Sequence, residues 1–336
     1  MSENDAVFEE MVFGTSPAML QISHAILQIA QYPAATVLLQ GESGTGKDVV
    51  ARAIHFLSSR GDHPLVPINC AAIPETLLET ELFGVESGAY TDARVTREGY
   101  VYRANGGTLF LDEISSMPLV LQAKLLRFLE TRSFRRVGST KEIHVDLRVI
   151  SASNVDLLTA VKSRTFREDL YYRLNVFPLN LPPLRERQED IEPLVMHFLQ
   201  KYSREADMQL KITPEAMELL KQYSWPGNIR ELRSAIQRGQ ILCTNYEIQP
   251  VDLPPEIRNG VKSRSQRLQE VLEEIHLPPE GLDLHQLVDD LSERLVREAL
   301  DQCTGNQVRA AALLHISRDQ LRYIRENRQK RSQKDY

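Results

Sequence analysis

Two short segments carry residues whose types and spacing suit phosphate chemistry. The first is a glycine-rich run that follows the aliphatic stretch ATVLLQ and opens a helical one: Gly41, Glu42, Ser43, Gly44, Thr45, Gly46, Lys47 and Asp48. Glycines let a chain curl so that its backbone N–H groups face a phosphate, and the dipole of the following helix adds positive field. Lys47 would reach the β- and γ-phosphates of a nucleotide. The segment predicts a phosphate loop that binds ATP, with an ordinary glycine-rich turn as the alternative.

An acidic pair supplies the second signal. The apolar stretch Thr108–Leu111 has the composition of a buried strand and ends at Asp112 and Glu113. Asp112 would hold Mg²⁺, and Glu113 would polarise the water that attacks the terminal phosphate. Such a pair is common after a strand, but beside a phosphate loop it predicts hydrolysis of ATP rather than binding alone.

The elements that must position these residues alternate along the chain. Two further aliphatic runs, Ala35–Gln40 and Leu147–Ser151, stop near glycine or polar residues, and stretches of helical spacing such as Asp48–Ser58 lie between the runs. Strands that alternate with helices predict a parallel α/β sheet with its ligand residues at the carboxyl edge. From about Pro178 the pattern changes, and Leu184–Asn245 predicts consecutive amphipathic helices of a smaller domain.

Composition excludes several other classes of protein. The 336 residues contain no run of 18 apolar residues that could span a membrane, and the acidic start lacks the layout of a signal peptide. Cys70, Cys243 and Cys303 form no CxxC pair, and the eight histidines show no ligand spacing. We therefore expect a cytoplasmic protein without a disulfide framework or a transition-metal site.

Five segments together resemble the bacterial enhancer-binding proteins, the AAA+ ATPases that activate sigma-54 RNA polymerase. In chain order they are GESGTGKD, INCAAIPETLLETELFG, GGTLFLDEIS, FREDLYYRLNVFPLNLPPLRER and WPGNIREL. The resemblance covers about residues 12–258 and, through a separate motif, the C-terminal end. The strict phosphate-loop pattern has Ser or Thr after its lysine, but this family usually has an acidic residue, as at Asp48. The resemblance implies Mg²⁺-dependent ATP hydrolysis by a homo-oligomeric ring, hexameric in this family.

The resemblance also implies roles for polar residues by position. Asn69 would be the switch that holds Glu113 until the nucleotide is read, and Asn154 would be a sensor near the γ-phosphate. Arg230, in WPGNIREL, would be a second sensor that links the helical domain to the nucleotide state.

Two arginines in FREDLYYR match the family's arginine fingers. Arg167 and Arg173 would reach the ATP of the neighbouring subunit, and a finger supplied in trans makes hydrolysis depend on assembly. Without the surrounding motif, the same arginines would be interpreted as surface ion-pair residues.

A third segment aligns with the GAFTGA loop through which this family contacts sigma-54. Its residues here are Gly88, Ala89, Tyr90, Thr91, Asp92 and Ala93. Tyr90 keeps an aromatic ring, but Asp92 replaces the second glycine. Glycine adopts positive φ freely, whereas aspartate does so at some cost and adds a charge. Asp92 therefore opens the question of whether contact with sigma-54 is retained.

The C-terminal end predicts DNA binding. Residues 304–336 contain eight basic and three acidic side chains, a net charge of +5, whereas the whole chain carries −6. NQVRAAALLH and SRDQLRYIRENR predict two helices about a short turn, similar to the Fis-type helix-turn-helix. Candidate DNA-binding residues are Ser317, Arg318, Gln320, Arg322 and Arg325. A dimerising helical hairpin is the alternative.

These observations predict five segments. They are a short leader (1–11), an AAA+ α/β subdomain (12–177), an AAA+ helical lid (178–258), a linker (259–284) and a Fis-type helix-turn-helix domain (285–336).

The predicted function is ATP-driven, sigma-54-dependent activation of transcription from enhancer DNA. Because only about eleven residues precede the ATPase, we expect control by a regulatory protein in trans or by expression level. One alternative is a DNA-binding repressor or regulator of general polymerase that keeps the AAA+ domain for assembly. Another is an unrelated AAA+ machine such as a helicase loader.

Overall fold

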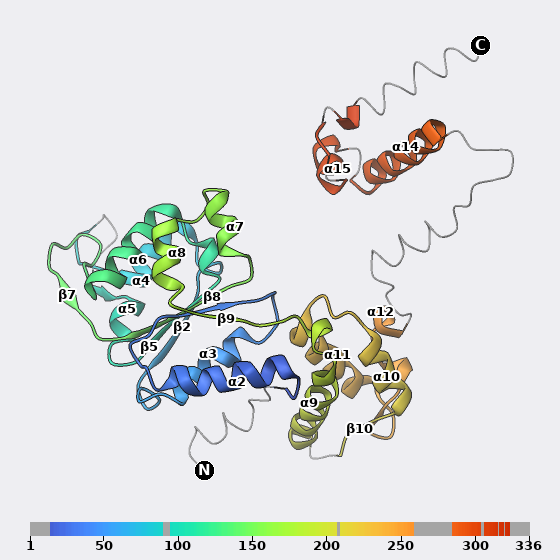
Figure 1. The fold of residues 1–336 in the computed structure, drawn as a ribbon, viewed down its shortest axis with the longest axis horizontal. Helices are drawn as coiled ribbons and strands as arrows, with labels where there is room; N and C mark the ends of the chain where they lie inside the picture. Colours follow the sequence, from blue (N-terminus) through green and yellow to red (C-terminus); the bar gives the residue numbers. More distant parts are fainter. Residues whose placement is uncertain are drawn as a thin grey trace. The chain divides into compact units, whose positions relative to one another are not determined.

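The chain folds as two compact units, Met1–Val261 and Lys262–Tyr336 (Figure 1). The computed structural model describes residues 14–89, 95–206, 209–258, 284–303, 306–314, 316–318 and 320–322. Among these residues, no helix is long and apolar enough to cross a lipid bilayer.

A five-stranded parallel sheet forms the centre of the first unit. Its order is β2 (Leu65–Asn69), β5 (Thr108–Asp112), β8 (Arg148–Ser153), β1 (Val37–Gln40) and β9 (Phe177–Asn180). The three central strands are almost wholly buried, as expected for a sheet covered on both faces. The α/β fold predicted from the aliphatic runs is confirmed.

The structure moves the predicted boundary between the α/β subdomain and the helical lid from 177/178 to a point after Asn180. Residues 178–180 belong to β9, which pairs with β1 from Val37↔Phe177 to Gln40↔Asn180. The sequence pattern changes from about Pro178, but the strand continues to Asn180. Both edge strands tolerate a proline, Pro67 in β2 and Pro178 in β9, since an edge strand leaves one row of donors unpaired.

Helices cover both faces of the sheet (Figure 1). One face packs on α2 (Pro17–Ala30) and α3 (Lys47–Phe56) through side chains such as Val37 and Leu39. Leu38, between them, points to the opposite core, because alternate side chains of a strand face opposite sides. The helices of that second layer are α4 (Glu75–Phe83), α5 (Tyr100–Arg103), α6 (Leu119–Thr131), α7 (Leu157–Lys162) and α8 (Glu168–Leu174).

Two small hairpins follow α4 and α6 in the chain. β3 (Gly84–Val85) pairs with β4 (Arg97–Glu98), and β6 (Ser133–Phe134) pairs with β7 (Ile143–His144). A bridge between Val85 and Val137 joins the two hairpins. The loop that aligns with GAFTGA lies between β3 and β4. Its Gly88 and Ala89 are described, whereas Tyr90, Thr91, Asp92 and Ala93 lie outside the described residues.

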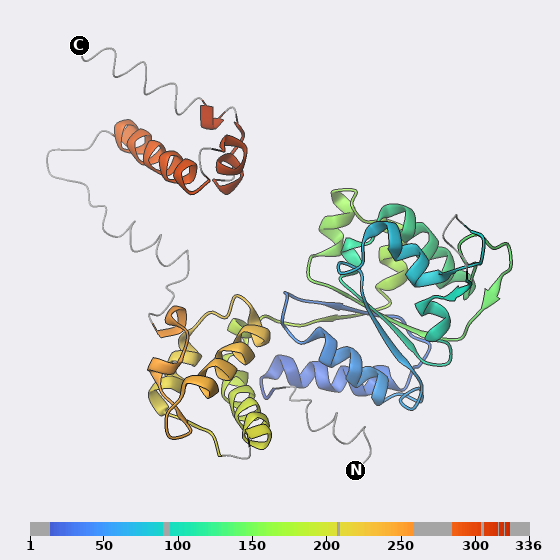
Figure 2. The ribbon, with the colours of Figure 1, turned by 180° about the vertical axis from the view of Figure 1, so that it is seen from behind.

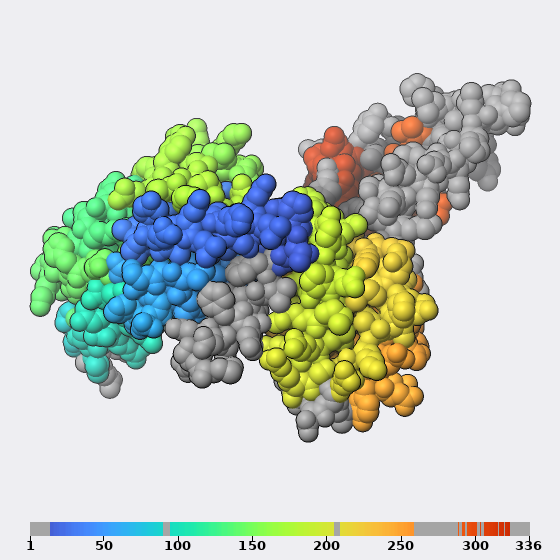
Figure 3. All heavy atoms as spheres, turned by 60° about the horizontal axis from the view of Figure 1, so that its bottom comes forward, coloured from blue at the N-terminus to red at the C-terminus, as the bar shows by residue number. Residues whose placement is uncertain are grey.

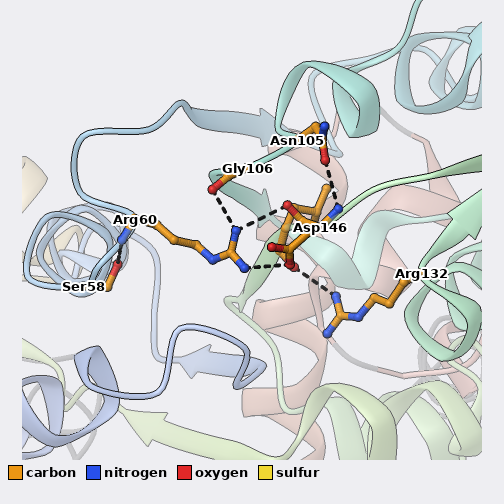
Figure 4. Close-up of polar contacts among 7 residues, drawn as sticks. Ser58, Arg60, Asn105, Gly106, Arg132 and Asp146 are labelled. Carbon is orange, nitrogen blue, oxygen red and sulfur yellow. Dashed lines mark hydrogen bonds and ion pairs between the residues drawn. The ribbon is translucent and has the colours of Figure 1, made fainter.

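An ionic cluster fastens the amino edge of the sheet, opposite the predicted phosphate loop (Figure 4). Arg60 Nη2 donates to Asp146 Oδ1 at 2.7 Å, and Arg60 Nη1 donates to Gly106 O at 2.7 Å. The amide oxygen of Asn105 accepts from the Asp146 N–H at 2.9 Å. Arg132, at the end of α6, adds a second positive charge beside Asp146. This cluster holds the loop after α3 against the starts of β5 and β8.

A helical subdomain completes the first unit (Figure 2). Its elements are η2 (Leu184–Glu186), η3 (Gln188–Asp190), α9 (Ile191–Ala206), α10 (Pro214–Gln222), α11 (Asn228–Leu242), η4 (Pro250–Asp252), α12 (Pro255–Arg258) and a two-strand pair, β10 (Lys211–Ile212) with β11 (Glu247–Ile248). Trp225 is fully buried in its core and donates from Nε1 to Leu220 O at 2.8 Å. The predicted helical lid is confirmed.

The second unit is a small helical domain. α14 (Leu284–Gln302) packs on α15 (Gln307–Leu313) around Val296, Ala299 and Ala310. Asn306 caps α15, because its Oδ1 accepts from the Val308 and Arg309 N–H groups at 3.1 and 3.2 Å. The small alanine side chains at this contact let the two helices approach closely.

Candidate functional site: a nucleotide site between sheet and lid

The glycine-rich run connects β1 to α3 at the carboxyl edge of the sheet. Gly44 and Gly46 have φ of 78° and 101°, in the left-handed region that side chains disfavour. A Cβ on Gly44 would lie 2.4 Å from Gly227 O, so only glycine fits under the lid at this position. The loop therefore curls at the N-terminus of α3, where helix N–H groups and the helix dipole favour an anion.

Lys47 folds back over this loop. Its Nζ donates to Gly41 O at 2.8 Å and to Glu42 O at 3.0 Å. Burial lowers the pKa of Lys47, while the carboxylates of Glu113 and Asp112 oppose that shift. The loop, the lysine and the acidic pair thus form one electrostatic site, as the two sequence signals predict.

The acidic pair lies at the end of β5. Asp112 Oδ1 accepts from the Glu113 N–H at 2.9 Å, and Glu113 has a left-handed φ of 53°. Burial raises the pKa of Glu113 first, and the neighbouring charge of Asp112 raises it further. Lys47 and the N–H of Asn154 act in the opposite direction. A carboxylate with a raised pKa next to a lysine is suited to accept a proton from water.

Asn69 is paired in register with Asp112, on the adjacent strand. Its Oδ1 accepts from the Ala71 and Ala72 N–H groups at 2.9 and 3.1 Å, so in this structure the amide oxygen holds its own loop rather than Glu113. Asn154 follows β8 by one residue and lines an open cavity of about 520 Å³ together with Gly41 and Glu42. Both asparagines lie at the predicted edge.

The lid contacts the phosphate loop directly. Arg230 Nη1 donates to Ser43 Oγ at 2.9 Å, which brings the predicted second sensor to the loop. Arg185 binds Glu42 with both terminal nitrogens, at 2.9 and 2.6 Å. This ion pair lowers the pKa of Glu42.

A cavity of about 460 Å³ lies beside the loop, between α3 and α9. Its apolar wall includes Met19, Leu181, Leu194, Phe198 and Ile229, and its charged wall includes Asp48, Arg52, Arg187, Lys201, Arg230 and Arg233. An apolar slot next to a phosphate loop fits an adenine ring. Figure 3 shows the blue surface of α2 next to the yellow-green surface of the lid.

Sequence reasoning missed most of this cavity wall. Met19 and Phe198 belong to no short motif, and Arg187, the last residue of FREDLYYRLNVFPLNLPPLRER, was given no role. The amphipathic pattern of Leu184–Asn245, which includes α9, predicted helices with one buried face. It did not indicate that part of that face borders a ligand cavity.

Family models match three successive parts of the chain. A sigma-54 interaction domain matches residues 12–180, an AAA+ ATPase lid domain matches 185–270, and a bacterial regulatory protein of the Fis family matches 288–323. This chain belongs to the sigma-54 interaction family of AAA+ ATPases. The family assignment derived from GESGTGKD, GGTLFLDEIS and WPGNIREL is confirmed.

Full-length relatives extend this result. Regulatory protein AtoC of Escherichia coli K12 is 49% identical over 93% of this chain and 66% of its own length. Transcriptional regulatory protein ZraR of Klebsiella oxytoca is 44% identical over 92% of this chain and 67% of its own. The chain thus spans about two thirds of the length of these relatives.

Solved structures share the fold of this ATPase. NtrX from Brucella abortus, in complex with ADP, is 34% identical, with a TM-score of 0.67 over 95% of this chain and 69% of its own. An ATP complex of the same protein gives the same identity and TM-score.

The two arginines predicted as fingers lie at the N-terminus and in the last turn of α8. Arg167, at the N-terminus of α8, is exposed and pairs with Asp169 at 2.6 Å. Arg173 donates from Nη2 to Leu129 O at 2.9 Å. In the part of the chain that the structure describes, the hydrogen bonds of both side chains are to α6 and α8.

The Fis-type end places its predicted DNA-binding residues around a capped helix start. Ser317 Oγ accepts from the Gln320 N–H at 3.2 Å, and Gln320 Oε1 accepts from the Ser317 N–H at 2.9 Å. This reciprocal pair is a capping box. Arg318 and Arg322 are exposed, whereas Arg325 lies outside the described residues.

Proposed function

We propose that this protein is a sigma-54-dependent transcription activator that binds enhancer DNA and uses ATP hydrolysis to remodel the closed complex of sigma-54 RNA polymerase. One observation carries the proposal. A phosphate loop, an acidic pair and a lid arginine converge on one site in a chain that also matches the sigma-54 interaction and Fis-type models.

The acidic pair is suited to Mg²⁺ that arrives with ATP. Among the described residues, no group of three or more His, Cys, Asp or Glu side chains forms a metal site by itself. Burial raises the pKa of Glu113 first and the charge of Asp112 raises it further, and a divalent cation would neutralise the charge of this pair. Mg²⁺ is usually bound by one or two carboxylates with substrate phosphates and water, where it neutralises phosphate charge. Asp112 would hold it.

Each residue around the site then has its own role in hydrolysis. Lys47 binds the terminal phosphates, and Glu113 accepts the proton of the attacking water. Asn154 and Arg230 read the γ-phosphate from the sheet and from the lid. Asn69 exchanges its present loop contacts for Glu113 when the nucleotide state changes.

Assembly completes the site in this proposal. Arg167 and Arg173 stabilise transition-state charge at the ATP of the neighbouring subunit in a hexameric ring. Their position on α8, without a contact to their own phosphate loop, supports an action in trans. ATP hydrolysis therefore requires the ring.

The ring has two binding partners, sigma-54 polymerase and DNA. Residues 88–93, next to the joined hairpins β3–β4 and β6–β7, contact sigma-54. Ser317, Arg318, Gln320, Arg322 and Arg325 bind enhancer DNA, with the exposed arginines at bases or phosphates. We place this activity in the cytoplasm, under the control of a regulatory protein in trans.

One residue favours a second candidate function. Asp92 stands where the family's contact loop has glycine, so a repressor or general-polymerase regulator that uses the AAA+ domain for assembly is the alternative. In vitro transcription from a sigma-54 promoter separates the two. The proposal expects ATP-dependent transcripts from the wild type and at most a few-fold change for Asp92→Gly. Transcripts that appear only with Asp92→Gly would support the alternative.

A further inference from the structure

The lid holds the outer side of the phosphate loop through three successive carbonyl oxygens. The bonds run from Asn228 Nδ2 to Ser43 O at 3.0 Å, from the Ile229 N–H to Gly44 O at 2.9 Å, and from Arg187 Nη2 to Thr45 O at 2.8 Å. Asn228 and Ile229 belong to α11, and Arg187 is the residue just before η3. The lid therefore fixes the orientation of three consecutive peptide groups.

These three hydrogen bonds, which we call the grip of the lid, have a geometric consequence for the inner side of the loop. In a trans peptide, the C=O of one residue and the N–H of the next point in opposite directions. No cis peptide bond occurs in the described chain. When the lid holds the carbonyls of residues 43–45, it turns the N–H groups of residues 44–46 away from itself. Backbone N–H groups of such loops are the donors that surround a phosphate.

We propose that Asn228 and Arg187 are positioning residues that preset the phosphate cradle, so that the lid sets the affinity for the phosphate part of the nucleotide. This inference rests on the proposed ATPase function. It differs from the role of Arg230, whose side chain would meet the phosphate itself. Asn228 and Arg187 act through the backbone of the loop.

Burial shows which lid contacts matter most. Asn228 and Arg187 are 0% and 2% exposed, whereas both side chains of the Arg185–Glu42 pair are 43% exposed. Exposed ion pairs contribute little because water and salt screen them, while a buried donor has no other partner to replace its acceptor. The side chains of Asn228 and Arg187 therefore dominate the grip.

Asn228 is suited to this position in three ways. Its Oδ1 accepts from the Leu184 N–H at 2.8 Å while its Nδ2 donates to Ser43 O and, at 3.2 Å, to Glu42 Oε2. Its φ is 53°, and asparagine tolerates the left-handed region better than most residues. No other common side chain offers this donor, this acceptor and this backbone preference together.

Arg187 connects the grip to the start of α2. Burial lowers the pKa of Arg187, and the nearby charge of Asp190 partly opposes this. Asp190, itself fully buried, accepts from the N–H and the hydroxyl of Ser16 at 2.7 Å each. Because Arg187 also lines the adjacent cavity, its substitution would disturb adenine and phosphate binding together. Asn228 is not among the residues that line that cavity, so it is the cleaner residue to test.

The experiment compares ATP with adenosine, which lacks phosphates. Asn228→Asp keeps the shape and the acceptor for Leu184 but loses the donor to Ser43 O. Asn228→Gly keeps the backbone conformation and removes the amide without adding charge. Dissociation constants are measured by calorimetry for ATP and by ligand-observed NMR for adenosine, in a Glu113→Gln background that prevents turnover. We expect ATP affinity to fall about tenfold or more in both variants, with adenosine affinity unchanged.

The matched control is Arg185→Ala, which removes a lid side chain that contacts the loop through Glu42 rather than through a carbonyl. Its ATP affinity is expected to change by no more than about threefold. Equal losses for ATP and adenosine in Asn228→Gly would show a merely structural role and overturn the inference. A loss of ATP affinity in Asn228→Asp but not in Asn228→Gly would reflect charge repulsion and would also overturn the inference. A parent protein that binds ATP no better than adenosine would overturn the proposed function as well.

Discussion

Glu113 lowers the stability of the folded protein at neutral pH because of its position. Its carboxylate is partly buried, lies beside Asp112 and has a left-handed backbone, and its pKa is raised. A group whose pKa is raised in the folded state favours folding below its unfolded pKa, near 4.5, and loses that contribution as pH rises through the folded pKa. At neutral pH the charged form is therefore a destabilising group.

Glu113→Gln should accordingly separate stability from activity. We expect a melting temperature at pH 7.5 that is higher than that of the parent by a few degrees or less, with the gain lost near pH 4. Hydrolysis should fall by about 10²- to 10⁴-fold, because the general base is gone. Thermal unfolding across this pH range and an ATPase assay check both effects. A variant less stable than the parent at pH 7.5 would contradict the electrostatic account.

Local motifs and tertiary contacts differ in how far the sequence reveals them. Lys47, Asp112 and Glu113 were predictable because each lies in a short segment whose residue types already define the chemistry. Arg187 and Asn228 were not, because their role is to donate to carbonyl oxygens of a loop more than 140 residues away. A carbonyl is present at every residue, so the sequence carries no mark of which ones are held.

At the scale of elements, the amino edge of the sheet depends on Asp146. This carboxylate lies between Arg60, whose side chain is 12% exposed, and Arg132. Arg60 follows α3 and Arg132 ends α6, and these helices lie on opposite faces of the sheet, so the cluster ties the two layers at that edge.

Asp146→Ala should leave the two guanidinium groups facing each other without a counter-charge. The Asp146 side chain is 84% exposed, so water screens its charge, and we expect the free energy of unfolding to fall by about 0.5–1 kcal/mol. Lys221→Ala, which breaks the exposed Lys221–Glu192 pair, should change it by less than about 0.5 kcal/mol. Urea unfolding followed by circular dichroism measures both. Equal effects of the two variants would mean that the cluster is only a surface ion pair.

The two edge strands of the sheet could not be predicted from the sequence pattern. β1, β5 and β8 are buried aliphatic runs and were predicted. β2 and β9 are more exposed and each contains a proline, Pro67 or Pro178, so neither shows a strand pattern. Their pairing follows from the tertiary position at the sheet edge, where a missing N–H costs nothing.

At the scale of the whole molecule, the position of α8 predicts that subunits complete each other's sites. Lys47→Ala should abolish nucleotide binding but keep the fingers, and Arg167→Ala should keep binding but lose about 10³-fold or more in hydrolysis. Mixing the two inactive proteins should restore part of the ATPase activity, since some interfaces then combine an intact loop with an intact finger. Coupled-enzyme ATPase assays on the mixture measure this. A mixture as inactive as its components would contradict action in trans.

The central claim is that ATP hydrolysis at this site drives opening of promoter DNA. The most direct measurement is permanganate footprinting of a sigma-54 promoter with purified sigma-54 polymerase, ATP and either the wild type or Glu113→Ala. We predict melted promoter DNA with the wild type and none with the variant. ATP hydrolysis by the wild type without melting, on a promoter shown to bind the protein, would contradict the claim and support the repressor function.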